Sequence, residues 1–116
     1  MKSILTLDME HCVICGSPNV EIHHVFGGPN RKNSDKYGLV VPLCHRHHNE
    51  PPAGVHHNEG SMLALQADAQ AVFESIESHE DFMRVFGRDY IETYKDWLQE
   101  HGKEVFEHWL KENKNE

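Results

Sequence analysis

Cysteines and histidines gather in the first half of the chain at spacings typical of metal ligands. Cys12 and Cys15 form a Cys-x-x-Cys pair followed by Gly16, and Cys44 and His47 form a second pair with the same spacing. Two such pairs suit one tetrahedral zinc ion, and three thiolates with one imidazole are a common ligand set for structural Zn²⁺. We therefore predict a structural Zn²⁺ site at these four residues, in a segment that has little apolar core of its own.

The number of cysteines also favours a metal site over disulfide bonds. The chain has 3 cysteines, an odd count that suits a site whose fourth ligand is a histidine better than it suits a disulfide framework. The alternative is that the cysteines are buried as small apolar side chains, which leaves both ligand spacings unexplained. The identity of the histidine ligand stays open, because His45 and His48 adjoin His47.

The first half of the chain holds further histidines that one zinc site does not use: His23, His24, His48, His56 and His57. Adjacent residues on a strand point to opposite sides, so one of His23 and His24 can hold a metal while the other activates a water molecule. His48 follows the zinc ligand and would complete an open site, whose free positions water and a phosphate oxygen can occupy. A histidine-rich surface without a defined site is the alternative.

The spacing of apolar and turn-forming residues predicts a short α+β unit in the first half. Two apolar segments are bounded by glycine and proline, and a proline pair stops the segment that carries the last metal ligands. The predicted elements are a strand over residues 20–26, a turn and loop over 27–37, a strand over 39–41, and a helix over 42–48 that starts at its proline.

The second half predicts helices. Apolar residues recur at helical spacing from Ser61 to Ile76, and Ser78 and Gly87 are typical flanking residues of a second, shorter helix. A third apolar stripe is formed by Ile91, Tyr94, Trp97 and Leu98, and Val105, Phe106, Trp109 and Leu110 continue it or form a fourth helix around Gly102. These aromatic residues are predicted to pack in a core rather than to bind a cofactor.

Length and hydropathy predict one folding unit without a membrane segment. The chain has 116 residues, enough for one domain, and no apolar run approaches the length that crosses a bilayer. Asp8 and Glu10 interrupt the apolar N-terminus, which does not resemble a signal peptide. We expect a cytoplasmic protein without a membrane partner, divided into a core over residues 1–58 and an acidic helical extension over 59–116 that packs on it as one unit.

Charge is distributed unevenly along the chain. The formal net charge is −8, but residues 1–60 carry 5 Lys or Arg against 6 Asp or Glu, whereas residues 61–116 carry 6 against 13. Most of the histidines also lie in the first half, where bound divalent cations would add positive charge. Contact with a polyanion is therefore expected in the first half of the chain.

Together these motifs resemble the HNH, or ββα-metal, nucleases in their zinc-stapled form. The resemblance is carried by Cys-x-x-Cys at 12–15, the His doublet at 23–24 and Leu-Cys-His-Arg-His-His at 43–48. It spans residues 12–58 and is strongest to phage-encoded members, including RecA-dependent recombination nucleases. The fold class that it implies is α+β, with a zinc-stapled ββα-metal core followed by an α-helical C-terminal extension.

The resemblance also implies roles for the unused histidines. His24 would be the general base on the attacking water, while His23 and His48 would bind one divalent ion, Mg²⁺ or Mn²⁺, that stabilises the leaving oxygen. His56 is the candidate third ligand of this ion, with His57 as the alternative. An imidazole with an ordinary pKa of roughly 6.5 and a metal ion are a sufficient minimal set for phosphodiester hydrolysis.

One position departs from the family pattern. The family has an asparagine before the leucine of its second strand, which orients the loop that carries the base, whereas this chain has Gly38. Asn30 or Asn33 could replace it from within the loop. The same loop carries Arg31 and Lys32, which with Asn30 are predicted to hold the phosphate backbone without reading bases; an ordinary solvated loop is the alternative.

The sequence therefore predicts a metal-dependent endonuclease that hydrolyses DNA phosphodiester bonds in phage or prophage recombination or DNA processing. Its expected partners are DNA and a recombinase or another phage or host DNA-processing protein, and the helical extension offers a surface for a homodimer. The alternative is a non-catalytic zinc module that binds DNA or protein, which the missing asparagine and the low positive charge favour.

Overall fold

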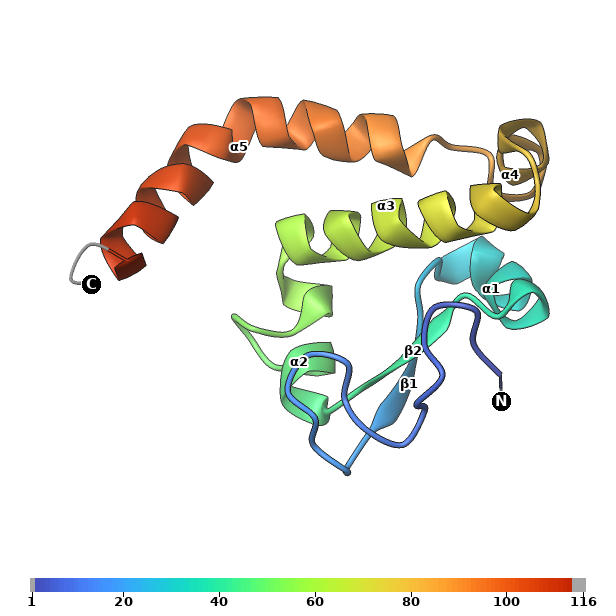
Figure 1. The fold of residues 1–116 in the computed structure, drawn as a ribbon, viewed down its shortest axis with the longest axis horizontal. Helices are drawn as coiled ribbons and strands as arrows, with labels where there is room; N and C mark the ends of the chain where they lie inside the picture. The colour runs from blue at the N-terminus through green and yellow to red at the C-terminus, as the bar shows by residue number, and fades with distance from the viewer. Residues whose placement is uncertain (1, 114–116) are drawn as a thin grey trace.

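In a computed structural model, the protein has a mixed α+β fold (Figure 1). The structure describes residues 2–113, apart from the side chains of residues 103 and 105–113. Within these residues, two antiparallel strands are accompanied by five α-helices and two short 3₁₀ helices. In chain order they are β1 Glu21–His24, η1 Gly28–Asn30, α1 Arg31–Tyr37, β2 Val40–Leu43, α2 His45–Asn49, η2 Val55–His57, α3 Glu59–Ile76, α4 His79–Phe86 and α5 Tyr90–Asn113.

The two strands form a small antiparallel sheet in which His23 pairs with Val41 and His24 with Val40. Both strands lie where the sequence predicts them, but β1 is shorter than expected and β2 extends through Pro42. The expectation that Pro42 begins the helix is therefore wrong. Proline is tolerated here because each strand of a two-stranded sheet has an unpaired edge, where a missing N–H costs no ladder bond.

The segment 31–37, predicted as a loop, is the helix α1. Its sequence is almost entirely polar, so it lacks the apolar stripe by which a short helix is recognised. Tertiary contacts stabilise it instead: the buried Ser34 hydroxyl donates to the carbonyl of Phe26 at 2.7 Å and accepts from the N–H of Phe26 at 3.1 Å. Gly38 ends α1 with φ of 69°, a left-handed conformation that favours glycine.

The predicted helices of the second half are present, with side-chain caps. Asn58 accepts a hydrogen bond from the N–H of Ser61 at the start of α3, and Ser78 accepts one from Asp81 at the start of α4. Gly87 ends α4 in the left-handed conformation, as expected. The third predicted stripe lies on α5, which runs without a break through residue 102. The side chains predicted to continue that stripe, Val105, Phe106, Trp109 and Leu110, lie outside the described residues.

Aromatic side chains from both halves of the chain share one core. Phe26, which follows β1, lies with its ring centroid 4.6 Å from that of Phe86 and 5.6 Å from that of Phe82. Phe73 of α3 packs in the same cluster with Leu39 and the other buried residues. The helices thus cover the unit that carries the sheet, and α3 lies between that unit and α5 (Figure 1). The boundary predicted at residue 58 coincides with the N-cap of α3, and the division into two parts stays a prediction.

A buried glutamine attaches α5 to α3. The Gln70 side-chain oxygen accepts hydrogen bonds from the N–H groups of Tyr90 and Ile91 at 2.8 and 3.1 Å, and its amide donates to Glu74 and Asp89. These bonds satisfy free N–H groups at the start of α5, which would otherwise lack partners in the core.

None of the helices in the described part of the chain combines the length and apolar character needed to cross a membrane.

Candidate metal centres

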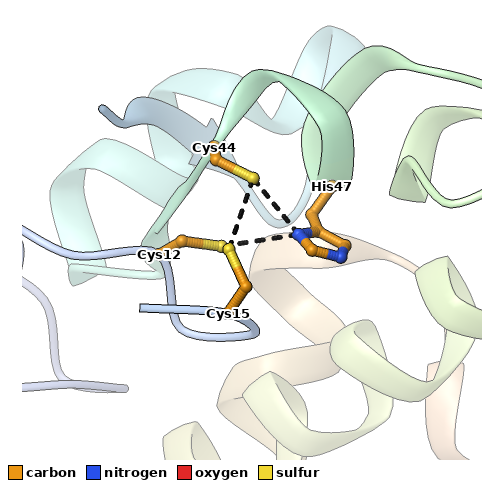
Figure 2. Close-up of side chains that lie close together, drawn as sticks. All are labelled: Cys12, Cys15, Cys44 and His47. Carbon is orange, nitrogen blue, oxygen red and sulfur yellow. Dashed lines mark hydrogen bonds between the residues drawn. The ribbon is translucent and has the colours of Figure 1, made fainter. Parts of the chain in front are cut away.

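The side chains of Cys12, Cys15, Cys44 and His47 point toward one another, as Figure 2 shows. Their ligand atoms all lie within 4.8 Å of one another. The Sγ atoms of Cys15 and Cys44 are 3.6 Å apart, and His47 Nδ1 lies 3.1 Å from Cys44 Sγ and 3.9 Å from Cys12 Sγ. Ligand atoms in a tetrahedral zinc site with ordinary bond lengths are about 3.4–3.8 Å apart. These four residues therefore form a possible zinc-binding site, as the sequence predicts.

A tight turn places the first two cysteines. The N–H of Gly16 donates to the carbonyl of Cys12 at 2.8 Å, and Gly16 takes a φ of 78° that favours glycine. Next to the turn, the N–H of Val13 donates to the carbonyl of Pro42 in β2 at 3.1 Å. The turn is thereby attached to the strand that leads directly into Cys44.

Cys44 and His47 lie on the first turn of α2. Cys44 is the N-cap of the helix and His47 lies three residues further on, a spacing that brings both side chains to the same face. His45 and His48, which the sequence left as alternatives, have other contacts: their Nδ1 atoms lie 3.0 and 2.8 Å from the carboxylate oxygens of Glu21. His47 is therefore the histidine that the fold brings to the cysteines.

The environment of Cys12 favours the thiolate that a metal requires. Burial of its side chain raises the pKa of the thiol, but backbone N–H groups of Cys44, Cys15 and Ile14 donate to the sulfur and lower the pKa to about 6 overall. A thiolate that already accepts hydrogen bonds is a ready metal ligand at neutral pH.

A second group of possible metal ligands is formed by three histidines. His23 of β1, His48 of α2 and His56 of η2 have nitrogen atoms within 4.8 Å of one another. The Nε2 atoms of His48 and His56 are 3.1 Å apart, and the His23 ring centroid lies 5.1 and 5.0 Å from theirs. Three imidazoles that converge from three elements present the donors of an open metal site. His57, the alternative to His56, is not part of this group.

His23 contributes a buried nitrogen without a partner. Its side chain is 1% exposed, and its Nε2 atom has no hydrogen-bond partner among the described residues. Burial, together with neighbouring His48 and His56, lowers the pKa of His23 to about 3, so the ring is neutral at physiological pH. Leaving a buried polar atom unpaired is costly, and a neutral imidazole that lies against two other imidazoles can serve as a metal ligand.

Glu21 is a residue of this site that sequence reasoning missed. Its carboxylate lies between His45 and His48. Hydrogen bonds with these two imidazoles lower the pKa of Glu21, and the bond with His48 has the larger effect. A carboxylate at Nδ1 leaves Nε2 of His48 free to face the other histidines, an arrangement that orients metal-ligating histidines in many proteins. The only sequence signal was local: Glu21 stands two residues before His23 and so lies on the same face of the strand, which does not indicate that it reaches His48.

His24 lies beside the three histidines in an open pocket of ≈ 290 Å³. The pocket is lined by Ile22, His23, His24, Gly27, Gly28, Arg31, His48 and His56. The Nε2 atom of His24 lies 2.7 Å from a carboxylate oxygen of Asp35, a residue of α1 that the sequence did not single out. The two members of the doublet thus have different environments at one pocket: His23 faces other imidazoles, and His24 faces a carboxylate.

The predicted phosphate-binding residues are only partly brought to this pocket. Arg31 lines it, whereas Lys32 is an exposed residue of α1 that does not. The Asn30 amide donates to the carbonyl of Phe86 at 3.2 Å, and Asn33 contacts Asn30 and the carbonyl of Val85. Both asparagines therefore attach this segment to α4, and neither takes the role of orienting His24 that the sequence allowed.

Gly54 permits the close turn that brings His56 to His48. A Cβ at this position would lie 2.7 Å from the backbone nitrogen of Glu50 and 2.9 Å from that of Asn49. Its φ of −68° suits any residue, so the constraint comes from contact with backbone and not from conformation. The chain can return this closely to the end of α2 only with a glycine.

We predict that Gly54→Ala displaces η2, lowers stability by about 1–3 kcal/mol and weakens binding of an ion at the three histidines by at least about 10-fold. Thermal unfolding and calorimetric titration of Mn²⁺ into zinc-loaded protein measure the two effects. Gly102→Ala is the matched control, because a Cβ there meets nothing within 4 Å and alanine favours a helix. Equal Mn²⁺ affinity in both variants would contradict the assigned role of Gly54.

Comparisons of this chain with family models, with curated proteins and with solved structures found no match.

Proposed function

We propose that this protein is a metal-dependent endonuclease of the ββα-metal kind that hydrolyses phosphodiester bonds in DNA. The observation that carries the proposal is the buried His23, whose Nε2 atom has no partner and whose ring lies against those of His48 and His56 at the pocket that His24 also lines. A buried imidazole nitrogen without a hydrogen-bond partner is rare in a folded protein and calls for an explanation, of which a bound ion is one. Beside an imidazole that can exchange protons, it supports a catalytic metal site rather than a solely structural one.

The donor set bears on the identity of the ion. Three imidazole nitrogens suit first-row transition ions, whereas Mg²⁺ prefers carboxylate, carbonyl and water oxygens. Of the two ions expected from the sequence, the three histidines therefore fit Mn²⁺ better than Mg²⁺. An ion held by His23, His48 and His56 would supply positive charge to a phosphate oxygen and to the leaving oxygen as negative charge develops there.

The remaining pocket residues have roles that follow from their chemistry. His24 can accept a proton from a water molecule placed against the phosphate, the general-base role that imidazole performs at neutral pH. Arg31 supplies a fixed positive charge at the pocket and can hold a second phosphate of the strand. Gly27 and Gly28 add no side chains to the lining, which leaves room for a nucleic-acid backbone.

We expect DNA cleavage by zinc-loaded protein to be at least about 10-fold faster with Mn²⁺ or Co²⁺ than with Mg²⁺ at equal concentration, because the nitrogen donors bind the first two more tightly. Initial rates on a labelled oligonucleotide across an ion series measure the order. A second protein preparation with His57→Ala serves as control, since His57 lies outside the histidine group and should leave the order unchanged. Fastest cleavage with Mg²⁺ would contradict the assignment of the three histidines as the only protein ligands.

The test of the proposed function is cleavage of single-stranded and double-stranded DNA by purified protein. The site formed by Cys12, Cys15, Cys44 and His47 is first loaded with zinc. Wild type and His23→Phe are compared in Mn²⁺, because phenylalanine fills the buried position without a donor atom. Cleavage by wild type alone supports the proposal. Absence of cleavage by a wild type that binds both ions would instead favour the non-catalytic zinc module, and addition of a recombinase filament then tests whether a partner must present the DNA.

A further inference from the structure

The contact between His24 and Asp35 has a chemical consequence. His24 Nε2 lies 2.7 Å from Asp35 Oδ1, and the His24 side chain is 14% exposed against 45% for Asp35. An ionised carboxylate can only accept a hydrogen bond, so the nitrogen that faces it must carry the proton. The neutral ring then has its lone pair on Nδ1.

We propose that Asp35 is a positioning residue for the proposed nuclease reaction, and this inference rests on that proposed function. Its carboxylate accepts the Nε2–H of His24, fixes the plane of the ring, and leaves Nδ1 as the atom that takes the proton from water. Asp35 belongs neither to the three-histidine group nor to the residues that line the pocket. Its effect on the reaction passes through His24.

The backbone around Asp35 is built to hold the carboxylate in place. The neighbouring Ser34 exchanges two hydrogen bonds with Phe26, two residues beyond His24. The carbonyl of Ser34 also accepts from the N–H of Leu39 at 2.8 Å, and Leu39 in turn accepts from Val25. Helix α1 is therefore attached to the ends of both strands at the position of His24, which holds the backbone of Asp35 in place relative to that histidine.

Other polar residues of the same segment do not compete for this role. The Asn30 and Asn33 amides are directed to backbone carbonyls of α4, and Arg31 has no acceptor atom to offer His24. Gly38 stands where the resembled family has its orienting asparagine, and it has no side chain. The carboxylate of Asp35 is thus the group that can orient His24 from α1.

The exposure of Asp35 makes the inference testable by substitution. The Asp35 side chain is 45% exposed, and substitution of an exposed side chain usually changes stability little, so Asp35→Ala should fold. We expect kcat for DNA cleavage to fall by about 10- to 1,000-fold while KM stays within about a factor of two, because the base is misoriented but the substrate contacts remain. Asp35→Glu, which restores the acceptor, should recover a large part of kcat.

A spectroscopic readout separates this inference from the proposed function. In zinc-loaded protein without a second ion, the Nε2–H of His24 should give a downfield, exchange-protected resonance, assigned by its loss in His24→Gln. The resonance should vanish in Asp35→Ala, return in Asp35→Glu, and persist in Asp8→Asn. The last variant removes a carboxylate from another histidine–carboxylate pair, His11 and Asp8, which is more exposed and lies outside the pocket.

Each outcome has a distinct meaning. A His24 N–H resonance that belongs to Nδ1, or that survives in Asp35→Ala, overturns the inference whatever the cleavage assay gives. Wild-type kcat in Asp35→Ala overturns the positioning role even if the resonance is lost. The resonance could vanish in Asp35→Ala while the wild type cleaves no DNA with any ion. That result overturns the nuclease proposal and with it the positioning role, and only the hydrogen bond between His24 and Asp35 is then supported.

Discussion

Removal of zinc from the cluster of Cys12, Cys15, Cys44 and His47 is expected to unfold the segment before β1 and to lower the stability of the protein. Residues 2–20 contain no helix or strand, and few backbone hydrogen bonds attach them to the rest, among them those from Ile4 to Gly38 and from Val13 to Pro42. Binding of structural zinc contributes about 10–16 kcal/mol in small zinc domains, as much as the whole stability of a typical domain. The segment cannot replace that contribution with apolar burial.

We therefore expect a strong chelator, or Cys15→Ser, to lower the apparent midpoint of thermal unfolding by at least about 10 °C. Cobalt substitution separates the two metal sites, because thiolate-to-cobalt charge-transfer absorption arises only at the cysteines. His45→Ala is the control, since His45 lies on α2 but contacts Glu21 and not the cluster. Unchanged stability on chelation, with the cobalt–thiolate absorption absent in wild type, would show that the cysteines do not form a metal site.

Substitution of His24 by alanine is expected to lower the rate of DNA cleavage by about 100- to 10,000-fold, the usual contribution of a general base. The zinc cluster and the three-histidine group use neither His24 nor its contacts, so both ions should remain bound. The His24 side chain is partly exposed and bonded to an exposed carboxylate, so the fold should survive. The expected phenotype is therefore loss of kcat without loss of metal or structure.

Cleavage of a labelled oligonucleotide by identically purified wild type, His24→Ala and His57→Ala tests this expectation. His57 is an exposed histidine next to the metal group but outside it, and its removal should leave the rate unchanged. Equal cleavage by wild type and His24→Ala would indicate a contaminating nuclease or a different base. Loss of Mn²⁺ binding in His24→Ala would instead make His24 a ligand.

Local spacing made the metal ligands predictable. Two pairs of ligands three residues apart must bring their side chains together, because a tight turn or a first helical turn allows little else. The His doublet on a predicted strand indicated two different roles for the same reason, since a strand alternates its faces. The helices of the second half followed from their apolar periodicity and from the flanking residues Ser78 and Gly87, whereas the Asn58 cap of α3 was not predicted.

Long-range contacts were not predictable in the same way. Glu21 reaches His48 across 27 residues and Asp35 reaches His24 across 11, and such pairs depend on how the strands and α1 pack. The choice of His47 over His45 as a zinc ligand required the direction of α2 relative to the cysteine turn. Helix α1 itself was missed because tertiary hydrogen bonds through Ser34, and not an apolar stripe, stabilise it.

The sequence by itself thus determined the ligands of the group at Cys12, Cys15, Cys44 and His47, since ligand types and short spacings are properties of neighbouring residues, whereas His23, His48 and His56 come together only in the fold. The partners that orient those ligands depend on the fold. Carboxylates are common on any surface, and only packing, through the contact of Gly54 with the end of α2 and of Ser34 with Phe26, selects which ones come within hydrogen-bond distance of a histidine.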